Sequence, residues 1–306
     1  MKRSIIASAL VVAGLALTGC STTPSARSSD TPLVVTTSAI VADFASRLGG
    51  DAVDVQLLVP NGFDSHTYEP KPSELALLAD ADLIVLPDVA LNALITGLVE
   101  LSGDSSRILD LNATALTADQ LVYSEPGNAA SANPHTWTSP VLASKWIVPL
   151  SERLLTLEGV TETQVRANAE LLLAEITALD TEIRTAFAEL GPQQRKLVVY
   201  HDAWEYFGRE YDIPVIGAIQ AASFAEPSAA ELVAMVEQIR AENVPAFFGS
   251  EVFPSDVLEA LEAETGAKYI PDLADDRLPG NPGDTDHSYV AMMRANLALL
   301  IAGLSS

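Results

Sequence analysis

The sequence alternates short apolar segments with longer amphipathic segments, and this alternation most constrains the fold. It runs through residues 32–160, stops, and begins again over residues 191–306. The short apolar runs suit buried strands, and the segments between them have the length and spacing of helices. Strands that alternate with helices favour parallel sheets with helices packed on their faces. The sequence therefore predicts an α/β fold.

Residues 161–190 interrupt the alternation with a single long helical pattern. Their apolar positions recur at helical spacing for about eight turns, without glycine or proline. A helix of this length between two alternating regions is typical of a rigid connector rather than a core element of either region. We therefore expect two similar lobes with parallel sheets, linked by this helix, although the two halves share no residue-level repeat.

The first residues differ in character from the rest of the chain. Residues 1–19 have a basic start followed by an apolar run that is short for a membrane span, which is typical of an export signal peptide. The sequence LTGC, which ends at Cys20, resembles the lipobox of bacterial lipoproteins. That resemblance implies cleavage before Cys20 and a lipid on it, and residues 20–31 are small and polar, as in a flexible tether. We therefore expect an exported protein, lipid-anchored to the cell membrane on its extracytoplasmic or periplasmic side.

Two bulk properties exclude other interpretations. Cys20 is the only cysteine, so the chain cannot form an intramolecular disulfide. The chain has 17 basic and 41 acidic residues and a net charge of -24. Because affinity for nucleic acid depends on basic side chains, this balance argues against a nucleic-acid partner.

The chain contains four histidines, and their positions carry most of the functional information. His66 lies in a loop after a predicted strand, His135 lies between a proline and a predicted helix, and His201 directly follows a predicted strand. Open α/β sheets bind ligands at the carboxyl ends of strands, where at least two of these residues lie. A solvated or core-bonded residue is the simpler interpretation of any single histidine, but three in short loops favour a metal site. We expect the fourth, His287, to cap or decorate the last helix.

Three imidazoles leave a coordination position that a carboxylate could fill. The irregular segment 272–286 supplies several aspartates. Most of them must be solvated surface residues, so at most one or two could be ligands.

Three motifs give the chain a specific resemblance. They are DSHTYEP around His66, NPHTWTSP around His135 and YHDAWEYFGREYDIP around His201. Together with the lipobox, and in the same order, they are similar to the motifs of the metal-binding solute-binding lipoproteins of bacterial ABC importers, the group that serves zinc and manganese. The likeness covers nearly the whole chain after residue 19, including the long helix between two lobes. One departure is Asn133, which stands where that family usually has aspartate.

The resemblance implies that His66, His135 and His201 are metal ligands in the cleft between the lobes. It also implies an aspartate as the fourth ligand, and the segment LADDRL matches the family pattern with Asp276. The alternatives for the fourth ligand are Asp275, Glu251 and His287.

Zinc is the metal that this ligand set favours. Three imidazoles and one carboxylate suit tetrahedral Zn²⁺, whereas Mn²⁺ prefers more oxygen ligands. In the family that the chain resembles, manganese binders generally carry glutamate where this chain has His201. Residues 118–134, however, lack the histidine-rich loop of many zinc-specific members. We therefore expect Zn²⁺ as the transported substrate, with Mn²⁺ as the alternative.

The expected function is that of an extracytoplasmic receptor, not an enzyme, which captures a divalent metal and delivers it to an ABC transporter membrane permease. We expect it to act as a monomer. One alternative is a lipid-anchored zinc hydrolase, because three histidine ligands alone would leave a position for a water molecule. A second alternative is a surface adhesin that uses the same fold structurally.

Overall fold

The computed structural model describes residues 30–305 apart from 102–103, 126–127, 129–130, 221–227 and 251–255. The predicted signal peptide, most of the tether, Cys20 and Glu251 therefore lie outside the described residues. Residues Thr31–Ser306 belong to one compact unit, which contains two four-stranded sheets.

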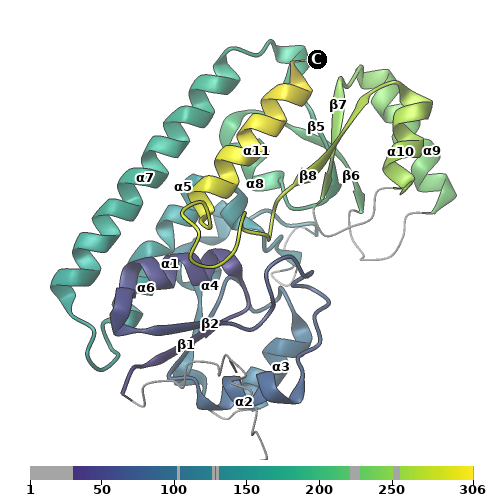
Figure 1. Cartoon of the computed structure of the whole chain (residues 1–306). Helices are drawn as coiled ribbons and strands as arrows, with labels where there is room; N and C mark the ends of the chain where they lie inside the picture. The colour runs from purple at the N-terminus through teal and green to yellow at the C-terminus, as the bar shows by residue number, and fades with distance from the viewer. Residues whose placement is uncertain are drawn as a thin grey trace, which may run out of the picture. The chain divides into compact units, whose positions relative to one another are not determined.

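The first sheet has the strand order β2-β1-β3-β4, and all of its paired strands are parallel. Its two central strands, β1 and β3, are buried along their whole length because helices cover both faces of the sheet (Figure 1). Helix α1 begins after Ser38, whose hydroxyl accepts a hydrogen bond from the backbone N–H of Val41. The elements of this lobe are β1 (Leu33–Thr36), α1 (Ala39–Gly49), β2 (Asp54–Leu57), α2 (Pro72–Asp80), β3 (Leu83–Leu86), α3 (Ala93–Leu101), β4 (Ile108–Asp110) and α4 (Leu111–Ala115).

The second sheet repeats this topology in the order β6-β5-β7-β8, again with parallel pairs. In each sheet the first strand in sequence lies between the second and the third. The prediction of two similar lobes with parallel sheets is therefore confirmed. The elements of this lobe are β5 (Leu197–His201), α8 (Glu205–Tyr211), β6 (Val215–Gln220), α9 (Ala229–Glu242), β7 (Ala246–Ser250), α10 (Asp256–Thr265), β8 (Lys268–Leu273) and α11 (Tyr289–Leu304).

The predicted long helix is α7 (Glu162–Ala188), which has 27 residues. It does more than connect the lobes, because it contacts α1 of the first lobe and α11 of the second. Its buried side chains, except Val165, belong to a hydrophobic core that contains residues of both lobes. The prediction of a long helix that links the two lobes is confirmed, but the expectation that it is not a core element is wrong. An apolar stripe at helical spacing along the whole helix requires a packing partner along that length. The stripe consists of Val165, Leu172, Ile176, Leu179, Ile183 and Phe187.

The segment that follows the first sheet forms two short helices, α5 (Pro140–Lys145) and α6 (Ile147–Leu154), instead of one. They are separated at Trp146, and Pro149 lies in the first turn of α6, where a missing backbone donor is tolerated. None of the helices within the described residues is both long and apolar enough to cross a membrane.

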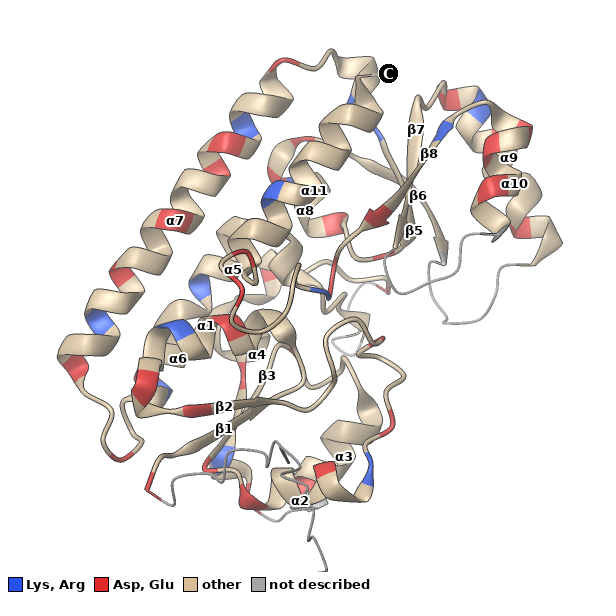
Figure 2. Cartoon of the chain, in the orientation of Figure 1, with Lys and Arg blue, Asp and Glu red and all other residues tan. Residues whose placement is uncertain are grey.

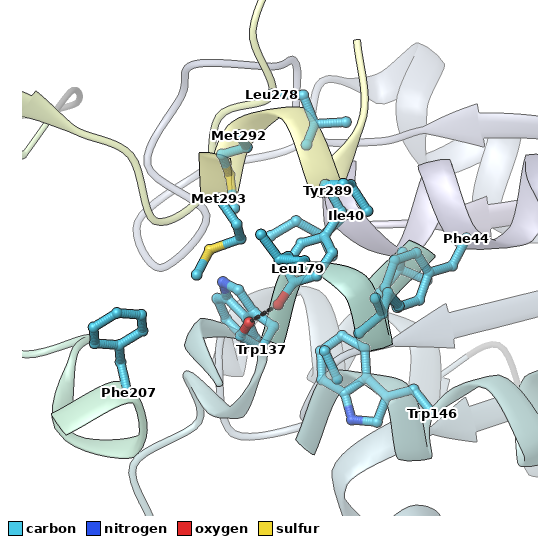
Figure 3. Close-up of a cluster of buried hydrophobic side chains, with 14 of the residues drawn as sticks. Ile40, Phe44, Trp137, Trp146, Leu179, Phe207, Leu278, Tyr289, Met292 and Met293 are labelled. Atoms are coloured by element: carbon cyan, nitrogen blue, oxygen red, sulfur yellow. Dashed lines mark hydrogen bonds between the residues drawn. The ribbon is translucent and has the colours of Figure 1, made fainter. Parts of the chain in front are cut away.

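An aromatic cluster lies in the hydrophobic core that contains residues of both lobes. Phe44 packs edge-on against Tyr289 at a centroid distance of 5.3 Å, and Trp137 lies 6.0 Å from Trp146 (Figure 3). The Tyr289 hydroxyl donates a hydrogen bond of 2.7 Å to the backbone carbonyl of Trp137. Because Tyr289 begins α11 and Phe44 lies on α1, this cluster joins the two lobes.

Candidate metal centre

Three histidines from distant parts of the sequence converge on one point. His66 lies on the loop between β2 and α2, His135 precedes the short turn Thr136–Thr138, and His201 is the last residue of β5. The Nε2 atom of His135 lies 2.9 Å from Nε2 of His66 and 3.0 Å from Nε2 of His201. All three ligand atoms lie within 4.8 Å of one another, and no other such group of metal-binding side chains occurs among the described residues.

The spacing of these nitrogens suits a single small cation. In a tetrahedral zinc site with Zn–N distances of roughly 2.0–2.1 Å, two ligand nitrogens are about 3.4 Å apart. The observed separations are shorter by a few tenths of an ångström. Small ring movements would therefore admit an ion between the three Nε2 atoms.

Burial keeps the three imidazoles neutral. The side chains of His135 and His201 are 4% and 7% exposed. Burial, and then the nearby His201 and His66, hold the pKa of His135 well below its usual value. Burial and the proximity of His66 lower the pKa of His201 to about 3, and burial also lowers the pKa of His66. Neutral imidazoles have the lone pair that a metal requires, so the site is ready to bind without first losing protons.

Asn133 orients the His135 ring. Its side-chain oxygen lies 2.8 Å from Nδ1 of His135 and also accepts the backbone N–H of His135. Because an amide oxygen can only accept, Nδ1 carries the proton and Nε2 presents its lone pair to the cluster. The amide nitrogen of Asn133 donates to the backbone carbonyl of Asp202, next to His201. One side chain therefore connects the second and third histidine motifs.

Asn92 supports the loop that carries His66. Its amide nitrogen donates to the backbone carbonyls of Ser65 and Tyr68, at 2.8 and 3.1 Å. Its oxygen accepts the backbone N–H of Ile95 in the first turn of α3. Asn92 was not among the residues predicted from the sequence, although an asparagine directly before a helical pattern is a recognisable N-cap signal.

Asn112 supports the loop that carries His135. Its amide nitrogen donates to the carbonyl of Pro134 at 2.9 Å, and its oxygen accepts from the Thr136 hydroxyl at 2.5 Å and from Trp146 Nε1 at 3.1 Å. The side chain is buried, and a second donation from its amide nitrogen, to the Asp88 carboxylate at 3.0 Å, completes its hydrogen bonds. No local pattern identifies this residue, because its partners are more than 20 positions away in sequence.

Asp276, the predicted fourth ligand, is not a member of the histidine group. Its carboxylate accepts a hydrogen bond of 2.5 Å from the hydroxyl of Ser65, the residue before His66. Asp275 is buried, and its backbone carbonyl accepts from Trp137 Nε1 at 2.7 Å. Both aspartates therefore lie on a segment of the second lobe that touches the ligand loops of the first.

The fourth histidine also lies outside the group. Nδ1 of His287 is 2.9 Å from the carbonyl oxygen of Pro279, within the loop before α11. The residue that caps α11 is Ser288, whose hydroxyl accepts the backbone N–H of Ala291. His287 thus precedes the predicted helix without providing its cap.

Comparison with known proteins gives a consistent result over the whole body of the chain. The sequence model described as "Zinc-uptake complex component A periplasmic" matches residues 34–303. A metal ABC transporter substrate-binding lipoprotein of Streptococcus sanguinis, SsaB, is 26% identical over the full length of both chains. The manganese-binding lipoprotein MntA of Halalkalibacterium halodurans is 24% identical, again over the full length of both.

The fold agrees with a solved structure of the same kind. The periplasmic zinc-binding protein TroA from Treponema pallidum superimposes with a TM-score of 0.82 at 25% sequence identity. The match covers 90% of this chain and 99% of that one.

Proposed function

The chain belongs to the zinc-uptake complex component A family of metal-binding solute-binding proteins, and from this premise we propose that Zn²⁺ is its preferred cargo. As a member of this family, it is the substrate-binding component of a metal ABC transporter and works with a membrane permease. It therefore binds and delivers an ion and is not an enzyme, so a hydrolase finds no support in the family.

The observation that carries the proposal is the convergence of three neutral Nε2 atoms from His66, His135 and His201. We assign these three histidines as the ligands of the cargo ion. Neutral imidazoles are the preferred nitrogen ligands of zinc, and burial makes all three neutral at physiological pH. Manganese prefers a larger share of oxygen ligands, which a site with three imidazoles does not supply.

We assign the fourth position to Asp276. Its hydrogen bond to Ser65 holds the carboxylate beside the loop of His66. A rotation of the side chain would exchange the serine hydroxyl for the ion, and a carboxylate would offset one of the two positive charges of Zn²⁺. Ion capture would then join a ligand of the second lobe directly to the first-lobe loop.

A competition titration tests the choice of metal. Metal-stripped protein is titrated with Zn²⁺ and with Mn²⁺ against chelators of known affinity. We expect one site per chain, with zinc bound at least about a hundredfold more tightly, as the preference of imidazole ligands predicts. Equal or tighter binding of manganese would overturn the zinc assignment and leave the receptor function intact.

We also propose that residues 1–19 are removed, that Cys20 carries the lipid, and that residues 20–31 tether a monomer outside the cytoplasm. The tethered body then comprises the lobes 32–160 and 191–306 with the connecting helix 161–190. The lipoprotein nature of SsaB and MntA supports this arrangement. Membrane fractionation compares the natural chain with Cys20→Ser. The natural chain should sediment with membranes and the variant should be released, whereas membrane retention of Cys20→Ser would contradict a lipid anchor at this position.

A further inference from the structure

Two asparagines fasten the ends of residues 274–278, which we call the strap. Asn296 accepts the backbone N–H of Ala274 at 2.9 Å and donates to the carbonyl of the same residue at 2.7 Å. Asn61 makes the same pair of hydrogen bonds with Leu278, and both of these measure 2.9 Å. In both cases a side-chain amide satisfies the two backbone groups of one residue.

The two asparagines that bond to the ends of the strap come from different lobes. Asn296 lies on α11, in the same lobe as the strap, and is 1% exposed. Asn61 lies between β2 and α2, on the same loop as His66, and is half-buried. A relative movement of the lobes would therefore leave the Asn296 pair intact and separate Asn61 from Leu278.

The backbone beside Asn61 is adapted to close contact with the strap. Gly62 has a φ of +89°, a conformation that favours glycine, and a Cβ there would lie 3.3 Å from Cδ of Arg277. Between the two fastenings the strap also carries the Asp275 carbonyl bonded to Trp137 and the Asp276 carboxylate bonded to Ser65. The strap therefore crosses from its own lobe onto the loops that present His66 and His135.

We propose that Asn61 is a positioning residue whose paired hydrogen bonds with Leu278 keep the strap closed over the histidine cluster and thereby set the rate of metal release. This inference rests on the proposed function, because it concerns the same site. In this proposal the ion leaves when the strap and the loop of His66 separate. Asn61 touches none of the three clustered nitrogens, so it acts through the strap and not on the metal. Since Asn61 is half-buried, water can replace Leu278 when the strap opens, and the contact is reversible.

The first test measures the rate at which the full-length protein releases Zn²⁺ into excess chelator. The variants Asn61→Ala and Asn281→Ala are compared. Asn281 is a matched control, because it is exposed and its side chain donates a hydrogen bond to Asp284, outside the strap. We expect Asn61→Ala to release the ion about tenfold faster, the scale expected for loss of two hydrogen bonds. The association rate and the absorption spectrum of the Co²⁺-loaded protein should stay the same as in the natural chain. An unchanged release rate would overturn the proposal.

The second test needs no variant. Hydrogen exchange is followed at two backbone amides, those of Leu278 and Ala274, with and without Zn²⁺. Because only the Leu278 amide is bonded across the lobes, we expect the ion to slow its exchange at least about tenfold and to leave Ala274 unchanged. Equal protection of Leu278 in both states would refute a reversible closure. Failure of the proposed function is recognised separately, because the natural chain would then bind neither Zn²⁺ nor Co²⁺. Tight binding with unchanged exchange at Leu278 would refute only the closure of the strap.

Discussion

At the level of single residues, asparagine side chains position each of the loops that carry the candidate ligands. Asn92 donates to the backbone carbonyl of Ser65, beside His66. Asn112 donates to the backbone carbonyl of Pro134 before His135 and accepts from the Thr136 hydroxyl after it. Asn133 joins the loop of His135 to the residue after His201. Because these amides are short and their partners are mostly backbone groups, they fix the loops with little loss of side-chain entropy. The histidines are therefore held close to one another by the protein.

Removal of any clustered histidine should abolish tight binding. His66→Ala, His135→Ala and His201→Ala each delete one of the three converging nitrogens. We expect the Kd for Zn²⁺ to rise at least about a hundredfold in each, because a three-histidine site loses a full coordination bond. His287→Ala is the matched control, since its ring lies outside the cluster, and its Kd should not change. Titration of the four variants in parallel decides the ligand set, and a normal Kd for any of the first three would remove that residue from it.

Loss of the Asn112 amide should destabilise the fold. In Asn112→Ala the carbonyl of Pro134 and the buried donors of Thr136 and Trp146 lose their common partner. Leaving buried polar groups unsatisfied costs about 1–3 kcal/mol each, so we expect a loss of at least ~2 kcal/mol in the free energy of unfolding. Urea denaturation of the metal-free protein measures this change. Asn281→Ala, at an exposed position, should change it by less than about 0.5 kcal/mol, and equal effects of the two substitutions would contradict the role of Asn112.

Zinc affinity should depend weakly on pH in the mildly acidic range. The pKa of His201 is lowered to about 3, and the pKa values of His66 and His135 are lowered as well. Protons then compete poorly for the site, whereas three ordinary histidines would together lose about a thousandfold in affinity by about pH 5.5. Titrations at about pH 7.5 and 5.5 should therefore give Kd values within about tenfold, and a thousandfold loss would contradict the neutral cluster.

The same shifts affect the metal-free protein in a defined direction. The unfolded chain takes up a proton on His201 below about pH 6.5, but the folded chain does so only near pH 3. The contribution of the neutral His201 to stability is therefore fully present above about pH 6.5, and it is lost as the pH falls from about 6.5 to about 3. His201→Ala should remove this part of the acid sensitivity in thermal unfolding measured over the same pH range.

At the level of elements, α7 fastens the two lobes along their common core. Its buried stripe faces α1, α5 and α11, so it packs on helices before and after the lobe boundary. A continuous packed helix resists bending because every change of angle would open gaps along its buried face. Small lobe movements, such as the opening of the strap, are therefore more compatible with this architecture than a wide hinge rotation.

Truncation of the α7 stripe should lower stability without changing the ligands. Leu179 is fully buried in the shared core, and Leu179→Ala should cost about 2–5 kcal/mol in the free energy of unfolding. Leu171 lies on the same helix and is 64% exposed, so Leu171→Ala should cost less than about 0.5 kcal/mol. Denaturant titration of both variants provides the comparison. A loss below about 1 kcal/mol in Leu179→Ala would contradict a packing role for the helix.

The elements were more predictable from sequence than the contacts between them. The alternation of apolar segments predicted the strands of both sheets and the long helix, because periodicity is a local property. The buried face of α7 was misjudged, since periodicity reveals an apolar stripe but not its partner. Likewise Asn112, Asn61 and Asn296 act on residues far away in sequence, and only the fold brings such pairs together.

At the scale of the whole body Thr31–Ser306, the two lobes have the same topology, and both contribute to the histidine cluster. The first lobe contributes the loop after β2 and the second contributes the end of β5, so the carboxyl ends of both parallel sheets face one site. Open α/β sheets commonly bind ligands at these ends. The strap of the second lobe, fastened by Asn61 of the first, then lies beside the cluster. This arrangement suits an ion receptor that binds a single cation between its lobes.

A zinc anomalous difference map from crystals of the zinc-loaded protein tests the central claim most directly. We predict one strong peak per chain, at roughly 2.0–2.1 Å from Nε2 of His66, His135 and His201 and with a carboxylate oxygen of Asp276 as the fourth ligand. A peak bound by a different set of residues, or no peak in protein saturated with zinc, would contradict the account.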